Sequence, residues 1–248
     1  MCQSGARLLG PGLTACPGRC TITNTMGEPM SETLCLDAGA PAAVDRAVEL
    51  LQRGEAVAFP TDTVYGLGAH AFLPQGVARL FAVKERPGQR AIPLLLPDAE
   101  AMHLVCVAIP DLAWELARHF WPGGLSLVLP RAARVPDMVT AGGPSVAVRV
   151  PDQELVRRIC RQLGAPLATT SANRHGAPDA VTAAQVLEGL AGRVPLILDG
   201  GTCRGGVAST VLDLTVSPPA LLRSGLIPVA ALAAVVGDLA LPPGAPSG

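Results

Sequence analysis

Short apolar strand patterns alternate with amphipathic helix patterns along most of this chain, from about Ala42 to Val236. The first helix pattern has apolar residues three and four positions apart at 44–51, and the apolar run 56–59 follows it directly. No internal repeat or long linker interrupts the alternation. We therefore expect one α/β domain with a twisted, mixed β-sheet and flanking helices, in which loops at strand ends bind the ligand.

The same pattern predicts individual elements. Thr182 and Gln185, three residues apart, form a capping-box pattern at the start of one helix. Further helices are expected to begin near Ala42, Pro74, Asp98, Pro110, Pro151 and Pro228. Strands are expected at 56–59, 92–96, 125–129, 146–150, 167–170, 194–198, 210–214 and 220–223.

The two ends of the chain lack this pattern. Residues 1–33 are rich in Gly, Pro, Cys and Thr without periodicity, so we expect a disordered N-terminal extension, or a stretch upstream of a start at Met26 or Met30. Residues 34–240 are expected to form the catalytic domain, and residues 241–248 a loose tail.

The composition excludes several classes of protein. Of the 248 residues 49% are apolar, enough for a sizeable core. The net charge of −1 argues against a protein coated in positive charge for non-specific binding to nucleic acid, although a local basic groove remains open. The apolar run 229–236 is far shorter than the roughly 20 residues of a membrane-spanning helix. No signal-peptide pattern is present, so we expect a cytoplasmic protein without a membrane partner.

The seven cysteines and four histidines show no spacing typical of a metal site. The cysteines are odd in number and scattered, and they contain no CxxC pair. We therefore expect reduced thiols and no metal held by the protein itself.

Only one of the 19 basic residues is a lysine, Lys84. With Arg86 and Arg90 it places three cations within seven residues, at the expected end of the second helix. Lysine presents a compact ammonium where arginine presents a planar fork, and such a cluster suits a polyphosphate. A solvated charged loop, or chance survival of one lysine in an arginine-rich chain, is the alternative. No P-loop motif accompanies the cluster.

Two further segments have a composition typical of binding loops. The sequence PTDTVYGLG at 60–68 contains the only tyrosine, Tyr65, and two glycines that permit close backbone approach. The sequence TTSAN at 169–173 offers hydroxyls and an amide to phosphate oxygens or a base. Taken alone, the first could be a strand with a glycine turn and the second a capped turn.

Arg149 and a glycine-rich loop complete the candidates. Arg149 lies in the alternating run 146–150, where it can clamp a carboxylate with two parallel hydrogen bonds or simply face solvent. The glycine-rich stretch 199–206 leads to Ser209 and can cradle phosphate through backbone N–H groups, which is weak support by itself.

Taken together and in order, these segments resemble the YrdC-like family of L-threonylcarbamoyladenylate synthases, in its short single-domain form, because the chain ends too soon for a second domain. The resemblance covers roughly 44–236 and includes PTDTVYGLG, KERP, WPGGLSLVLP, VAVRVP, TTSAN, ILDGG, STVLDL and LLRSG. It implies a YrdC-like twisted mixed sheet around a concave basic cavity. It also implies a nucleotidyltransferase that joins L-threonine, bicarbonate or CO2, and ATP into threonylcarbamoyl-AMP and pyrophosphate.

The resemblance also implies roles for individual residues and partners. ATP is a substrate, accompanied by Mg²⁺, and partner proteins use the product to modify the adenosine beside the anticodon of certain tRNAs; weak tRNA binding is compatible with this reading. No general base is evident. L-Threonine is expected to contact Thr63, Arg149, Thr169 and Ser209. ATP is expected to contact Lys84, Arg86, Ser171, Asn173 and Arg223, with Lys84 and Arg86 catalytic.

The chain departs from the family pattern at three places. WPGG at 121–124 replaces the WPGP of many members, and the strand 93–96 lacks a histidine that some members carry. Asp179 stands where members often have serine, and an acid there repels phosphate unless Mg²⁺ intervenes.

Two rival functions remain. A non-catalytic module of the same fold would bind RNA or nucleotide without turning over ATP, and the near-neutral charge weighs against it. A carbamoyltransferase of hydrogenase maturation ranks last, because this chain lacks the length and the cysteine pairs of that group.

Overall fold

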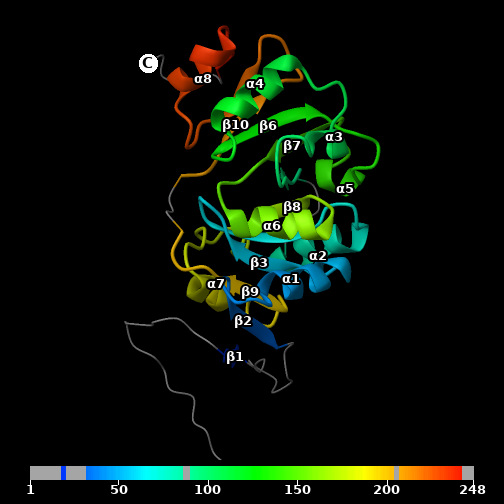
Figure 1. Ribbon diagram of the computed structural model, residues 1–248, viewed down its shortest axis with the longest axis vertical. Coiled ribbons are helices and arrows are strands. Elements are labelled where there is room, and N and C mark those ends of the chain that lie inside the picture. The colour runs from blue at the N-terminus through cyan, green and yellow to red at the C-terminus, as the bar shows by residue number, and fades with distance from the viewer. Residues whose placement is uncertain (1–17, 21–31, 86–89, 204–206, 242–248) are drawn as a thin grey trace, which may run out of the picture.

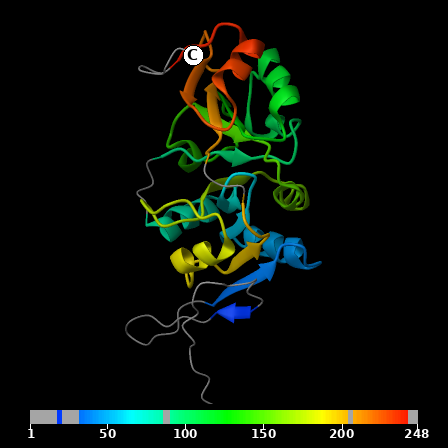
Figure 2. The same cartoon turned by 90° about the vertical axis from the view of Figure 1, so that its left-hand side faces the viewer.

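A single sheet of eleven strands runs through the computed structural model, which describes residues 18–20, 32–85, 90–203 and 207–241. The strand order is β1-β2-β9-β3-β4-β8-β5-β7-β6-β10-β11, with parallel and antiparallel neighbours. Helices cover both faces of this sheet (Figures 1 and 2). The expected α/β architecture with a mixed sheet is confirmed.

The strands are short and are joined mostly by helices or tight loops. Their bounds are β1 Gly18–Cys20, β2 Thr33–Asp37, β3 Val57–Pro60, β4 Tyr65–His70, β5 Leu94–Leu95, β6 Leu125–Pro130, β7 Ser145–Arg149, β8 Leu167–Ser171, β9 Leu196–Asp199, β10 Thr210–Asp213 and β11 Ala220–Arg223. The helices are α1 Ala43–Gln52, α2 Pro74–Lys84, α3 Met102–Val105, α4 Asp111–Phe120, α5 Asp137–Thr140, α6 Glu154–Leu163, α7 Ala183–Leu190 and α8 Val229–Val236.

Two apolar clusters lie on opposite faces of the sheet. Helices α1 and α6 pack on one face, and α2, α3, α4, α7 and α8 contribute to the cluster on the other. Strand β3 contributes to both clusters: Val57 and Phe59 belong to the cluster under α1 and α6, and Ala58 belongs to the cluster on the other face. This alternation is what an extended chain produces when both of its faces are buried.

Strand β4 is an element that the sequence pattern hid. Its sequence YGLGAH contains two glycines and resembles a turn, yet it pairs with β3 and β8 in the middle of the sheet. A Cβ atom at Gly68 would lie 2.6 Å from the Phe59 ring, so glycine here makes room for a core aromatic side chain. Thr182 does form the predicted capping box with Gln185.

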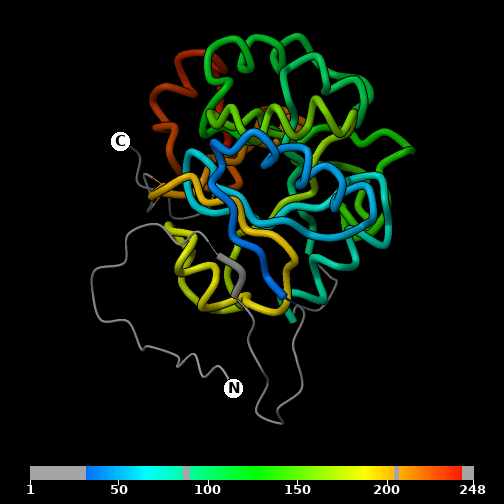
Figure 3. Tube along the Cα trace, turned by 60° about the horizontal axis from the view of Figure 1, so that its bottom comes forward, coloured from blue at the N-terminus to red at the C-terminus, as the bar shows by residue number. Residues whose placement is uncertain are grey.

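The N-terminal side of the sheet extends beyond the expected domain. Thr33–Asp37 (β2) pairs with β9, which Figure 3 shows as the blue and yellow traces side by side. Gly18–Cys20 pairs with β2, inside the stretch 1–33 for which a disordered extension is expected. Residues 1–17 and 21–31 lie outside the described residues, as does most of the expected tail 241–248, so those boundaries stay predictions.

Among the described residues, no helix has the length and apolar character of a membrane-spanning segment.

Strands β8 and β5 separate β4 from β7 in the sheet. Even so, Arg149 at the end of β7 reaches Asp62, which precedes β4, with 2.6 Å between Nη2 and Oδ2. The Arg149 side chain therefore connects the end of β7 with the loop before β4, across the two intervening strands.

Candidate active site

The end of helix α2 brings Lys84 against the loop that leaves β8. Lys84 is only 5% exposed, and the next residue, Glu85, ends the helix in a left-handed conformation (φ 53°). The Lys84 Nζ atom donates to the Ser171 carbonyl at 2.7 Å and to Asn173 Oδ1 at 2.8 Å. The hydroxyls of Thr170 and Ser171 lie 3.3 Å from the same nitrogen. Four oxygens thus position one ammonium group.

A second cation, Arg149, is fixed from two sides. Its Nε donates to the Gly123 carbonyl at 2.8 Å, and its Nη2 donates to Asp62 Oδ2 at 2.6 Å. The Arg149 and Asp62 side chains are 8% and 11% exposed, so this ion pair is largely withdrawn from water. Such a pair is screened little by salt and holds the guanidinium in one orientation.

A third cation, Arg223, closes the group from the end of β11. Its Nε and Nη2 donate to the carbonyl and the hydroxyl of Ser209, at 3.0 and 2.9 Å. The Ser209 hydroxyl also lies 2.9 Å from the hydroxyl of Ser126. Burial lowers the pKa of Arg223, and the nearby charge of Arg149 lowers it further, while Asp179 raises it.

The threonines of the PTDTVYGLG segment form a small hydroxyl cluster. Thr61 Oγ1 lies 3.0 Å from Thr63 Oγ1, and both residues are buried. Thr169 on β8 adjoins them, because a Cβ atom at Gly66 would meet Thr169 Cγ2 at 3.0 Å and Thr61 Cγ2 at 3.4 Å. Glycine at this position lets the two strands bring their threonines together.

The lone tyrosine has a structural position. The Tyr65 hydroxyl donates to the Gly201 carbonyl at 2.8 Å and accepts from the Gly200 N–H at 3.2 Å. Burial raises the pKa of Tyr65 well above its usual value, so the phenol stays protonated and can keep donating. Tyr65 thereby ties the glycine-rich loop after β9 to the start of β4.

Asp179 is held next to the Lys84 loop rather than left as an isolated acid. Its Oδ1 accepts from Asn173 Nδ2 at 3.2 Å, and Asn173 Nδ2 also donates to the Ala177 carbonyl at 2.5 Å. The repulsion expected between this acid and phosphate stays a prediction.

Most of the expected site residues are visible, and their contacts fall into three groups. Lys84 lies with Ser171 and Asn173, Arg223 with Ser209, and Thr63 and Thr169 in the hydroxyl cluster beside the Arg149–Asp62 pair. Arg86 lies outside the described residues. The ligand roles assigned to these residues stay predictions.

Sequence reasoning did not assign a role to three residues that hold these groups. Asp62 stands between two threonines in the PTDTVYGLG segment, and that place was the available signal. Ser126 and Gly123 lie in the WPGGLSLVLP segment, but a strand serine and a backbone carbonyl gave no sign of these contacts. In the described part of the chain, no group of three or more His, Cys, Asp or Glu residues could hold a metal ion.

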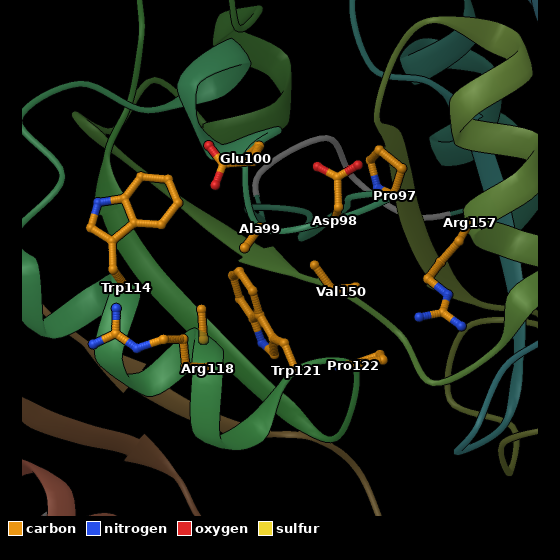
Figure 4. Close-up of a pocket in the computed structure, with 11 residues that line it drawn as sticks. Pro97, Asp98, Ala99, Glu100, Trp114, Arg118, Trp121, Pro122, Val150 and Arg157 are labelled. Carbon is orange, nitrogen blue, oxygen red and sulfur yellow. The ribbon is translucent and has the colours of Figure 1, made fainter.

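A pocket of about 380 Å³ lies next to this site but does not contain it (Figure 4). Its lining includes Pro122 and Val150, the chain neighbours of Gly123 and Arg149, together with both tryptophans, Trp114 and Trp121. Neither Lys84 nor Arg149 lines it. The concave basic cavity expected between the three cations stays a prediction.

Comparisons with known proteins agree with the fold and its motifs. The family model Sua5/YciO/YrdC, described as "Telomere recombination", matches residues 49–225. A protein of Pyrococcus abyssi called threonylcarbamoyl-AMP synthase is 41% identical over 197 residues, which are 79% of this chain and 58% of the relative. The Bacillus subtilis protein of the same name is 39% identical over 79% of this chain and 57% of its own length. The chain thus spans somewhat more than half the length of these two relatives.

A shorter relative and two solved structures complete the comparison. The Photobacterium profundum threonylcarbamoyl-AMP synthase is 33% identical over 64% of this chain and 87% of its own length. The crystal structure of P. abyssi Sua5 complexed with L-threonine has a TM-score of 0.82 and 38% identity, and covers 85% of this chain and 63% of that one. Escherichia coli YciO, at 24% identity and a TM-score of 0.70 over 79% of this chain and 95% of that one, shares the fold.

Proposed function

This chain belongs to the Sua5/YciO/YrdC family, and we propose that it is an L-threonylcarbamoyladenylate synthase. In the proposed reaction, L-threonine and CO2 or bicarbonate give a carbamate. A carbamate oxygen then attacks the α-phosphorus of ATP, and pyrophosphate leaves. The names of the relatives and the threonine complex of P. abyssi Sua5 support this choice of substrates.

One observation in the structure carries the proposal. Lys84 Nζ contacts Asn173 Oδ1, and Asn173 Nδ2 contacts Asp179, so a cation from α2 and the loop after β8 are joined directly. We propose that Arg223 from β11 and Arg149 from β7 belong to the same site as Lys84. A nucleotide triphosphate and an amino-acid carboxylate together supply the negative charge that such a site stabilises.

The proposed division of labour follows the contacts. Arg149 holds the threonine carboxylate, while Thr63 and Ser209 face its hydroxyl, with Thr169 beside them. Lys84 and Arg223 hold the phosphates of ATP together with Ser171 and Asn173. Arg86, adjacent in sequence to this group, is proposed to act with Lys84 in stabilising the charge that develops as pyrophosphate leaves. Catalysis then rests mainly on positioning and electrostatics.

The remaining parts of the proposal concern the metal and the partners. Mg²⁺ enters with ATP as part of that substrate, and the Asp179 carboxylate is an oxygen ligand of the kind Mg²⁺ prefers. Partner proteins consume the adenylate in modifying tRNA, with any direct contact of this chain to tRNA being weak. Since tRNA and ATP meet there, we place the enzyme in the cytoplasm.

Identification of the product tests this function. The protein is incubated with ATP, L-threonine and ¹³C-bicarbonate. The nucleotides are then separated, and their masses are measured by mass spectrometry. We expect threonylcarbamoyl-AMP labelled on its carbamoyl carbon. Binding of ATP or tRNA without any labelled adenylate would instead support a non-catalytic binding module of the same fold.

A further inference from the structure

One oxygen of the Asp62 carboxylate has no partner in the described part of the chain. Oδ2 accepts from Arg149 at 2.6 Å, whereas Oδ1 is shielded from solvent and makes no hydrogen bond there. An unpaired carboxylate oxygen in a largely buried position is costly, and native proteins keep such groups for a ligand, a water or a catalytic role. A carboxylate oxygen only accepts hydrogen bonds, so its missing partner is an N–H or O–H donor.

The surroundings of Asp62 narrow the choice of donor. Arg149 pairs with one of its oxygens, and the next residue, Thr63, lies in the hydroxyl cluster. Arg149 has five N–H donors, and the bonds to Gly123 and Asp62 occupy two of them within the described residues. The Arg149 guanidinium and the Asp62 carboxylate lie side by side, and each can still form hydrogen bonds. Together they complement the two opposite charges of a zwitterion.

We propose that Asp62 Oδ1 binds the α-ammonium group of the amino-acid substrate, an inference that rests on the proposed function. Arg149 binds the substrate carboxylate, Asp62 the ammonium and Thr63 the hydroxyl. Three protein groups, two of them consecutive in the chain, thus match the three polar groups of threonine.

The position also suits the chemistry that the amine must undergo. A substrate held by its carboxylate alone can swing about that contact, whereas one held at both charges has its nitrogen fixed, and this ammonium loses one proton to water before its lone pair attacks CO2. Charge-assisted hydrogen bonds are short and directional, which supports this positioning. Asp62 is thereby a substrate-binding residue that sets specificity for an α-amino acid over the corresponding hydroxy acid.

The test compares two ligands that differ only in the amino group. Isothermal calorimetry measures binding of L-threonine and of (R)-3-hydroxybutyrate, which keeps the carboxylate and the hydroxyl. The wild type should prefer threonine by on the order of 10- to 100-fold, the range of a hydrogen bond to a charged group. In Asp62→Asn the preference should fall to within about 3-fold, because a neutral amide lacks the charge.

Two further variants serve as controls for the comparison of wild type with Asp62→Asn. Asp213→Asn makes the same chemical change at the end of β10, where Asp213 accepts from Thr215, and should keep the wild-type preference. Asp62→Glu retains the charge and should keep part of the preference for threonine. This variant still tests the inference if Asp62→Asn fails to fold because it has lost the ion pair with Arg149. Melting curves accompany each variant.

The possible outcomes separate the inference from the proposed function. If Asp62→Asn weakened both ligands by the same factor, Asp62 would act only by holding Arg149, and the inference would be overturned while threonine binding stood. Equal affinity of the wild type for the two ligands would overturn it as well. Failure of the wild type to bind threonine at all would overturn both.

Discussion

The Nζ atom of Lys84 lies 2.8 Å from Oδ1 of Asn173, although the two residues are 89 positions apart in the chain. The contact joins the last residue of α2 to the loop after β8, so a helix end and a strand end position one ammonium group. Two of the segments that the sequence singled out independently therefore form one structure. The lone lysine places a compact ammonium among four oxygens.

We predict that Lys84→Arg loses activity although it conserves charge. The guanidinium is wider than the ammonium, and its donors point in a fixed fork that four oxygens arranged around Nζ do not match. A misplaced cation beside a reacting phosphoryl group costs on the order of 100-fold in rate. Lys84→Ala should lose at least as much. Turnover is measured as pyrophosphate release, with melting curves to confirm folding.

Arg79→Lys, a half-buried residue of the same helix that pairs with Glu55, is the control for that pair and should retain activity. If Lys84→Arg turned over near the wild-type rate, the argument for a compact charge would fail, and the single lysine would be an accident of composition.

Gly225 should be intolerant of any side chain. A Cβ atom there would lie 2.3 Å from the Ala208 carbonyl oxygen and 2.5 Å from the Ser209 carbonyl carbon, both of them backbone atoms. Gly225→Ala should therefore destabilise the fold by about 1–3 kcal/mol and displace Ser209 from Arg223. Urea unfolding and pyrophosphate release measure the two effects.

Gly189→Ala is the matched control for Gly225→Ala. Gly189 lies inside α7, and its nearest Cβ neighbour, the Arg174 nitrogen, is 4.0 Å away. Alanine in a helix with free space stabilises by about 0.5–1 kcal/mol. Similar effects of the two substitutions would show that the turn after β11 is not packed as tightly as described.

His70 should make stability depend on pH in the acid range. Burial lowers the pKa of His70 below its ordinary 6.5, and its Nδ1 accepts a hydrogen bond from the Phe72 N–H at 3.2 Å. The unfolded chain therefore binds a proton more readily than the folded chain, so stability is lost as pH falls from 6.5 through the folded pKa. Asparagine can accept the same bond without titrating.

Unfolding free energies of the wild type and of His70→Asn, measured at about pH 7.5 and about pH 5.5, test this prediction. The wild type should lose more stability than the variant over that interval. An equal loss in both proteins would assign the acid sensitivity to other groups.

Much of the fold could be predicted because its elements carry periodic patterns. The α6 helix ends at Gly164 as expected, because glycine readily adopts the left-handed conformation there, but it begins at Glu154 with Gln153 as its cap and not at Pro151. Strand β4 was missed because its two glycines serve packing against Phe59 rather than a turn. The strand order could not be predicted from the sequence, because pairing between β4 and β8 depends on residues about 100 positions apart.

The site was predictable to the extent that its residues have unusual chemistry. Lys84 and Arg149 were identified by type and place, but the partners that orient them, Asp62 and Gly123, were not. A backbone carbonyl leaves no signature in the sequence, and a lone aspartate between threonines is ordinary until Arg149 is placed beside it. Long-range contacts of this kind require the fold.

Threonine-dependent pyrophosphate release tests the proposed function most directly. The protein is incubated with ATP and bicarbonate, alone or with L-threonine or 2-aminobutyrate, which lacks only the hydroxyl. We predict release that requires L-threonine and falls by orders of magnitude with 2-aminobutyrate, because a site built to bind a hydroxyl leaves its own polar groups unpaired without one. Release at the same rate without an amino acid, or equally with 2-aminobutyrate, would contradict the assignment of this chain as a threonine-using adenylate synthase.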